Sequence, residues 1–246
     1  STLVDRGWVQ RNDVDKSYAI GSYLAVLGRE LAASRPTEQL AHDAAAKLAV
    51  EVGFTAVVVH LVNDAVVVTD VLPAPGTTSG IAVGNRVPFL PPFGPGFVAW
   101  AASTEQEEWL AYAGRNNPAL EARLREVLPA IRDRGYSLER LDSASAVAFD
   151  VLGQLQDDVF SDAVREVLGR MLALLAQVDF LPSELRRGKH AVTSMAAPVF
   201  DETGAVVLNL ALQPKGTFSG QELSRLGESL ATVAAGVTQT IGGVSP

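Results

Sequence analysis

The sequence predicts an α+β fold in which helices flank an antiparallel sheet. Two observations support this prediction: the valine-rich strands come in pairs joined by short turns, and the helical segments cluster between those pairs. A parallel sheet would instead require strands and helices to alternate along the chain. The composition, with 48% hydrophobic and 20% charged residues among 246, is that of a folded globular protein.

The main strands are expected in two hairpins, at residues 54–62, 65–72, 191–200 and 205–212. The first pair is separated only by Asn63 and Asp64, which favour a tight turn between paired strands. The second pair is joined by the turn sequence Asp-Glu-Thr-Gly at 201–204. Shorter strands are expected at 81–83 and 136–141. Short connections such as those at 63–64 and 201–204 are typical of antiparallel strand pairing.

Helices are expected where apolar residues recur every three or four positions. They are residues 21–33, a segment capped by Thr37, short segments from Phe97 and from Thr104, the stretch 120–131, residues 143–185 and a long final helix. Ser219 with Glu222 forms a capping box for the final helix, and Thr104 with Glu107 resembles another. Pro129 is expected to interrupt the helix in which it lies.

The sequence lacks several residue patterns that enzymes and metal sites require. There is no cysteine, so disulfides, thiolate metal sites and a cysteine nucleophile are excluded. The three histidines show no metal-ligand spacing, and no G-x-S-x-G elbow, P-loop or H-E-x-x-H sequence is present. We therefore expect no catalysis, no cofactor and no metal ion.

Charge and hydropathy limit the partners of the protein. The net charge of −8 indicates that most of the chain does not contact nucleic acid, because phosphate binding requires basic surfaces. No apolar run approaches the roughly 20 residues that span a bilayer. Residues 1–10 lack the apolar core of a signal peptide. A cytoplasmic protein without a membrane partner is expected.

Short motifs occur in order along nearly the whole chain outside 142–185. They are LVDRGWV at 3–9 followed by KSYAIG at 16–21, LAVLG at 24–28, RVPF at 86–89, GPGFVAW at 94–100, IRDRGY at 131–136 and SMAAPVFD at 194–201. In their order and spacing they resemble the isocitrate lyase regulator (IclR) family of bacterial transcriptional regulators. Among the departures from the family pattern, Phe97 stands in place of a lysine, and residues 142–185 resemble an insertion that common members lack.

The resemblance implies three regions. Residues 1–20 are expected to be the end of a winged-helix DNA-binding domain, namely its wing hairpin, with the first helices of that domain absent. Residues 21–36 are expected to form a linker helix. Residues 37–246 are expected to form a GAF-like effector-binding domain with a helical insertion at about 142–185. A protein of this kind is a ligand-responsive transcriptional regulator that works as a homodimer or tetramer.

The expected DNA-binding residues lie in the wing. Arg6, Arg11 and Lys16 are basic and stand where a wing meets phosphates. Operator DNA would be bound through the complete winged-helix domain. The alternative is a solvated hairpin whose basic residues contact only water.

The expected effector-binding residues lie on one loop–helix turn and on two neighbouring strands. They are Phe93, Gly94, Gly96, Phe97, Trp100, Ser194, Ala211 and Gln213. The family binds the acid group of its effectors at the turn, and backbone N–H groups at a helix N-terminus favour a carboxylate. The family places pocket-facing side chains at the three strand positions.

The effector is expected to be a small organic acid with a sizeable apolar body. The turn is rich in aromatic residues, and Ala211 replaces a serine of the family pattern. Two alternatives stay open. In the first, the aromatic residues are ordinary core, and Ser194 and Gln213 face solvent. In the second, the whole domain is a GAF-like dimerisation or interaction module without a ligand. A change of stability on adding a ligand separates the last alternative from a sensor.

Overall fold

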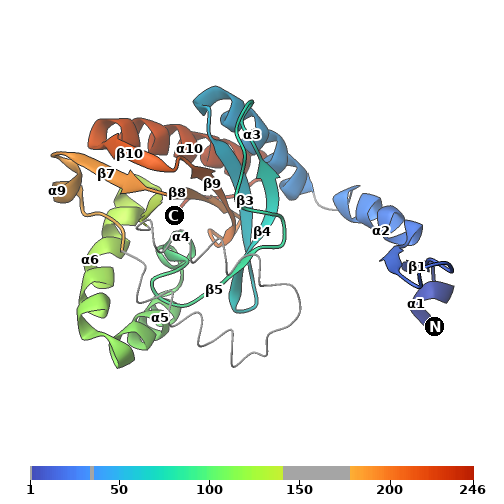
Figure 1. The fold of residues 1–246 in the computed structure, drawn as a ribbon. Helices are drawn as coiled ribbons and strands as arrows, with labels where there is room; N and C mark the ends of the chain where they lie inside the picture. The colour runs from blue at the N-terminus through green and yellow to red at the C-terminus, as the bar shows by residue number, and fades with distance from the viewer. Residues whose placement is uncertain (1, 34–35, 141–177) are drawn as a thin grey trace. The chain divides into compact units, whose positions relative to one another are not determined.

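The computed structural model describes residues 2–33, 36–140 and 178–246 (Figure 1). The chain divides into two compact units, Ser1–Leu40 and Ala41–Pro246, each described here by itself. Among the described residues, no helix combines the length and the hydropathy needed to cross a membrane.

The first unit contains a helical turn, a hairpin and a helix. They are α1 (Thr2–Asp5), β1 (Val9–Arg11), β2 (Tyr18–Ile20) and α2 (Ser22–Ala33). The two strands pair antiparallel, with Val9 opposite Ile20. Gly21 packs directly on Gly7, because a Cβ at Gly21 would lie 2.0 Å from the Gly7 carbonyl oxygen. Only glycine therefore fits where the hairpin leads into α2.

The second unit is built on a six-stranded sheet with the order β5-β4-β3-β9-β8-β6, in which every adjacent pair is antiparallel. Its strands are β3 (Thr55–Val62), β4 (Ala65–Leu72), β5 (Arg86–Pro88), β6 (Ser137–Glu139), β8 (Ser194–Phe200) and β9 (Val206–Gln213). Two further strands, β7 (Lys189–Val192) and β10 (Gly216–Ser219), form a separate antiparallel ribbon. The predicted α+β class with an antiparallel sheet is confirmed.

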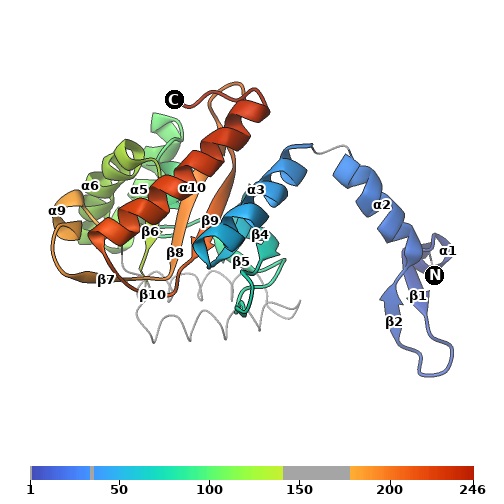
Figure 2. The same ribbon diagram turned by 90° about the horizontal axis from the view of Figure 1, so that it is seen from above.

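Helices lie on both faces of this sheet (Figures 1 and 2). They are α3 (Pro36–Val52), α4 (Pro95–Val98), α5 (Ser103–Asn116), α6 (Pro118–Arg134), α9 (Pro182–Leu185) and α10 (Gly220–Thr240). Helix α10 packs on β8 and β9 from one face, with α3 beside it (Figure 2). The single turn α4 packs on the same two strands from the other face and connects them to α5 and α6.

Several boundaries that depend on local sequence are as predicted. Asn63 and Asp64 form the two-residue connection between β3 and β4, with Val62 opposite Ala65. The Ser219 hydroxyl accepts a hydrogen bond from the backbone N–H of Glu222, and the Glu222 carboxylate accepts one from the N–H of Ser219. This is the predicted capping box at the start of α10.

Other predictions about helix ends were wrong. Helix α5 begins one residue before Thr104, because the carboxylate of Glu105, not that of Glu107, accepts from the backbone N–H at the cap, Ala102. Thr37 lies inside α3, which begins at a proline, a residue suited to the first helical turn. Pro129 does not interrupt α6. It is exposed, so water can solvate the carbonyl that its missing N–H leaves unbonded.

The predicted strands also need three corrections. Residues 81–83 form no strand; the side chain of Asn85 accepts from the N–H of Ala82 at 2.7 Å and holds a turn, so β5 begins only after it. The expected strand 191–200 is divided at Thr193 into β7 and β8, which pair with different strands, and β10 was not predicted at all. Of the helical prediction at 143–185, residues 143–177 lie outside the described residues. Residues 182–185 are helical, whereas 178–181 are not.

Candidate functional site

The sheet face that α4 covers carries small and polar side chains at its centre. Ala196 of β8 lies opposite Ala211 of β9, and Val57 of β3 lies opposite Ala211 on its other side. These three side chains form one buried cluster, and partly buried apolar residues surround it, namely Val59, Val68, Val71 and Ile81. This part of the sheet is therefore apolar but bears little side-chain volume.

A row of polar side chains borders the alanines. The Gln213 amide nitrogen donates to the Ser194 hydroxyl oxygen at 3.1 Å. The Ser194 hydroxyl in turn donates to the carboxyl group of Glu139, which lies opposite Ser194 on the neighbouring strand β6. Gln213, Ser194 and Glu139 thus form a hydrogen-bonded row across three adjacent strands, β9, β8 and β6, and we call them the polar row.

Glu139 in this row has an unusual protonation equilibrium. Part of the residue is exposed, but its carboxyl group lies among protein atoms, and this burial raises its pKa to about 7. The negative charge of Asp179 adds to the effect, while the hydrogen bond from Ser194 opposes it. Near neutral pH the carboxyl group of Glu139 is therefore divided between its neutral and its ionised form.

The predicted loop–helix turn reaches the same sheet face. Gly94 adopts a left-handed conformation, with φ of 82°, and precedes α4. A Cβ at Gly96 would lie 3.2 Å from the Asn209 side-chain amide and 3.3 Å from the Ser137 hydroxyl, so α4 begins against β9 and β6. Within the described part of the chain, the Phe97 N–H donates to the Gly94 carbonyl at 2.9 Å, and the Gly96 N–H makes no backbone hydrogen bond.

The far end of α4 is held by side chains from α5 and α6. The guanidinium of Arg132 donates to the carbonyl of Ala99 at 2.8 Å. The amide of Gln106 donates to the carbonyls of Ala99 and Ala101, each at 3.1 Å. The carbonyls that follow this one-turn helix are therefore satisfied, and the turn has a defined position.

The predicted aromatic residues do not all gather at the polar row. Phe93 and Phe97 are buried, and Phe97 meets Phe89 edge-on with ring centroids 6.4 Å apart. Trp100 instead packs edge-on against Phe200, at 5.8 Å, and against the core of α5 and α6. Phe200 ends the strand that Ser194 begins, roughly 20 Å away along an extended chain. The structure thus places Ser194, Ala211 and Gln213 on one face of β8 and β9, sets Gly96 against Asn209 and Ser137 on that face, and separates Trp100 from the polar row.

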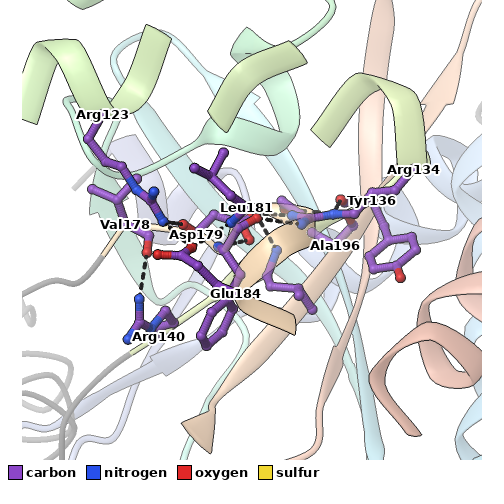
Figure 3. Close-up of polar contacts among 12 residues, drawn as sticks. Arg123, Arg134, Tyr136, Arg140, Val178, Asp179, Leu181, Glu184 and Ala196 are labelled. Carbon is purple, nitrogen blue, oxygen red and sulfur yellow. Dashed lines mark hydrogen bonds and ion pairs between the residues drawn. The ribbon is translucent and has the colours of Figure 1, made fainter. Parts of the chain in front are cut away.

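Sequence reasoning missed two residues of this region. Glu139 follows the IRDRGY motif on a predicted short strand. Residues two apart in a strand share a face, so Glu139 could have been placed on the same face as Ser137. Asp179 fell in a segment predicted as helical, so nothing indicated it. Its buried carboxylate accepts from the Leu138 N–H at 2.7 Å and from the guanidinium of Arg134 (Figure 3).

The candidate DNA-binding residues are all exposed in the first unit. The guanidinium of Arg11 lies 6.0 Å from the centre of the Tyr18 ring, and the ammonium of Lys16 donates to the Asp13 carbonyl at 2.8 Å. Arg6 follows α1. Over the residues that the structure describes, no group of three or more acidic or histidine side chains is arranged to hold a metal ion.

No protein-family model matches the sequence, and no curated protein matches it significantly. Solved structures do. An IclR transcriptional regulator from Alicyclobacillus acidocaldarius is similar over 98% of this chain and 82% of its own, with a TM-score of 0.66 and 20% identity. The IclR protein of Thermotoga maritima matches over the same shares, with a TM-score of 0.61 and 17% identity. HmgR of Pseudomonas aeruginosa does so with a TM-score of 0.61 and 19% identity. The chain therefore has the fold of the IclR-family transcriptional regulators.

Proposed function

We propose that this chain is the effector-sensing part of a transcriptional regulator, and that its effector is a small organic anion with an apolar body. The observation that carries the proposal is the sheet face beneath α4, where the polar row borders buried alanines. A ligand site combines an apolar surface with a few well-placed polar groups, and this face has both. The site residues are proposed to be Gly96, Ser194, Ala211 and Gln213, with Glu139 added and with Phe93, Gly94, Phe97 and Trp100 supporting the turn.

The chemistry of the face suits an amphipathic acid. Val57, Ala196 and Ala211 offer an apolar surface, and burying the body of a ligand there gains roughly 25 cal/mol per Å². The polar end of the ligand would then meet Ser194 and Gln213 on the sheet and the N–H of Gly96 from α4. A hydroxyl-rich ligand would leave polar groups unpaired against the alanines, at about 1–3 kcal/mol each.

The first unit is proposed to belong to the DNA-binding end of the regulator. Residues 1–20 would be the wing, with Arg6, Arg11 and Lys16 near phosphates, and residues 21–36 would be the linker. Tyr23, Leu24, Val26 and Leu27 of α2 are each at least 36% exposed. An amphipathic helix buries such a face, so a homodimer or tetramer is proposed, and light scattering at micromolar concentration measures it. A monomer would contradict this part of the proposal.

A thermal-shift panel of matched acids tests the effector. Glyoxylate and pyruvate represent small acids, and benzoate, phenylacetate and octanoate represent acids with apolar bodies. We expect stabilisation by the larger acids, and Gln213→Ala should weaken it. Gln239→Ala, at an exposed position of α10, is the matched control and should leave it unchanged.

Two results would contradict the proposal in different ways. Stabilisation by glyoxylate and pyruvate alone would show that the apolar surface is core, and the effector class would be wrong. No stabilisation by any acid at millimolar concentration, with an oligomer in solution, would favour an interaction module without a ligand.

A further inference from the structure

One side chain on the site face comes from outside the sheet. We call the buried group of Val57, Ala196 and Ala211 the apolar cluster. Of the four partly buried residues that pack against it, three belong to strands β3 and β4. The fourth, Ile81, lies in the loop that connects β4 to β5 (Figure 1). Ile81 therefore contacts the apolar cluster from another element, whereas the three valines are part of the sheet beside it.

Hydrogen bonds on both sides of Ile81 restrict its place. The N–H of Ile81 donates to the Ser79 hydroxyl oxygen at 3.0 Å. The four residues that follow, 82–85, form a turn in which the N–H of Asn85 donates to the Ala82 carbonyl at 3.1 Å. The side-chain oxygen of Asn85 accepts from the N–H of Ala82 at 2.7 Å. The loop around Ile81 thus has its own hydrogen-bonded structure.

This turn is bound to the sheet. The N–H of Gly84 donates to the Val68 carbonyl at 2.8 Å, and the N–H of Val68 donates to the Asn85 carbonyl at 2.9 Å. Gly84 has a φ of 91°, a conformation that glycine adopts without strain. Val68 itself packs against the apolar cluster. A ligand that displaced Ile81 would have to break these hydrogen bonds, so the side chain is a fixed part of the face.

The loop and the polar row lie on opposite sides of the apolar cluster. Strand β3 crosses this face in successive rows at Thr55, Val57 and Val59, because residues two apart share a face. Thr55 lies opposite Gln213, at one end of the polar row. Val57 belongs to the apolar cluster, and Val59 lies opposite Val68, to which the turn is bound. The face therefore runs from polar groups, across the cluster, to the loop of Ile81.

Ile81 stands where the apolar body of the proposed effector would end. An acid held by its carboxylate at the polar row would extend across the apolar cluster toward this loop. We propose that Ile81 is a specificity-determining residue, whose side chain limits the length of acid that binds. The inference rests on the proposed function, because it takes the polar row as the place of the acid group. Each buried methylene strengthens binding roughly fourfold while room remains, and a body that reaches a packed side chain loses this gain.

The test measures binding of straight-chain acids, from butanoate to dodecanoate, by calorimetry at pH 7.5. For the natural chain, affinity should rise by up to roughly fourfold per methylene and stop rising at a limiting length. Ile81→Ala opens space, so its limiting length should increase by roughly two methylenes. Ile81→Phe should shorten it. Val83→Ala is the matched control, because Val83 belongs to the same loop and is 64% exposed, and it should leave the limiting length unchanged.

Two results of this series would overturn the inference. Equal limiting lengths in the natural chain and in Ile81→Ala would show that Ile81 does not bound the ligand. An equal increase in Val83→Ala would assign the effect to the loop as a whole. Should Ile81→Ala not fold, Ile81→Val, which makes a smaller change at the same place, decides by the same comparison.

Methyl NMR distinguishes this inference from the proposed function. Without ligand, the methyl signals of Ala196 and Ala211 should shift in Ile81→Ala and stay in place in Val83→Ala. With the longest acid that binds, nuclear Overhauser effects should join its terminal methyl to Ile81. Effects to Ala211 but none to Ile81 would overturn the inference and leave the effector proposal standing. Binding of no acid by the natural chain would overturn the effector proposal, and with it the role of Ile81.

Discussion

The two faces of β8 and β9 differ in side-chain volume more than in burial. On the face that α10 covers, Met195, Leu208, Leu210 and Leu212 are at most 1% exposed. On the opposite face, Ser194, Ala196, Asn209 and Ala211 are also buried, none more than 9% exposed, yet they are small or polar. The same two strands therefore supply a core of large apolar side chains on one side and a buried face of small and polar side chains on the other. Burial alone would not distinguish them.

Truncation on the packed face should have the largest effect on stability. Leu210→Ala removes a fully buried side chain and leaves a cavity, which typically costs 2–5 kcal/mol. We expect a loss of this size in the free energy of unfolding measured with urea. Val62→Ala, at a position 43% exposed, is the control and should cost far less. Equal losses in the two variants would mean that α10 does not pack as described.

Enlargement on the opposite face should reduce ligand binding more than stability. Ala211→Leu adds volume beside Val57 and Ala196, so we expect about 1–3 kcal/mol of destabilisation and loss of benzoate and octanoate binding. Ala235→Leu, which adds the same side chain at an exposed position of α10, should change neither. A folded Ala211→Leu protein that binds both acids normally would show that the ligand lies elsewhere.

The stability of the chain should fall as the pH rises from about 4 to about 7. Folding raises the pKa of Asp179 from 3.8 to about 6 and that of Glu139 from 4.5 to about 7. The unfolded chain therefore ionises first, and each group disfavours folding in the window between its two values, by roughly 1 kcal/mol per pH unit. Urea denaturation in a pH series measures this slope. In Glu139→Gln the slope above pH 6 should disappear, and an unchanged slope would assign it to other groups.

The elements that sequence predicted well are those determined by neighbouring residues. Asn63 and Asp64 specify their turn, and Ser219 with Glu222 specifies the start of α10, because the interacting groups are two to three residues apart. Strand β10 was missed because its partner, β7, lies more than twenty residues earlier in the chain. Pairing at that distance leaves little trace in local periodicity.

The resemblance suggested part of the candidate site, and sequence gave no sign of the rest. Ser194 and Gln213 were identified through the resemblance, and they are hydrogen-bonded to each other. Trp100 was grouped with them because it follows the same turn, but its ring packs against Phe200. Asp179 reaches Leu138 across 41 positions of sequence. No local pattern marks an aspartate that caps the edge of a distant strand.

The smallest effect is expected from the polar row itself. Ser194→Ala removes the acceptor of the Gln213 amide and the donor to Glu139, with a net cost of about 1 kcal/mol because water can reach part of Gln213. Ser183→Ala, at an exposed position of α9, is the control. Combined with a second substitution, this change tests whether the polar row acts as one unit. Substitutions of residues that share hydrogen bonds cause losses of free energy that do not add.

A double-mutant cycle of Ser194→Ala with Gln213→Ala provides that test for both unfolding and benzoate binding. If the row acts as a unit, the second substitution should add little to the first, because the bond between the two side chains is already lost. Strictly additive losses would mean that Gln213 and Ser194 contribute separately. The site face would then be a set of independent polar residues around the alanines, without the continuous row that leads from Gln213 through Ser194 to Glu139.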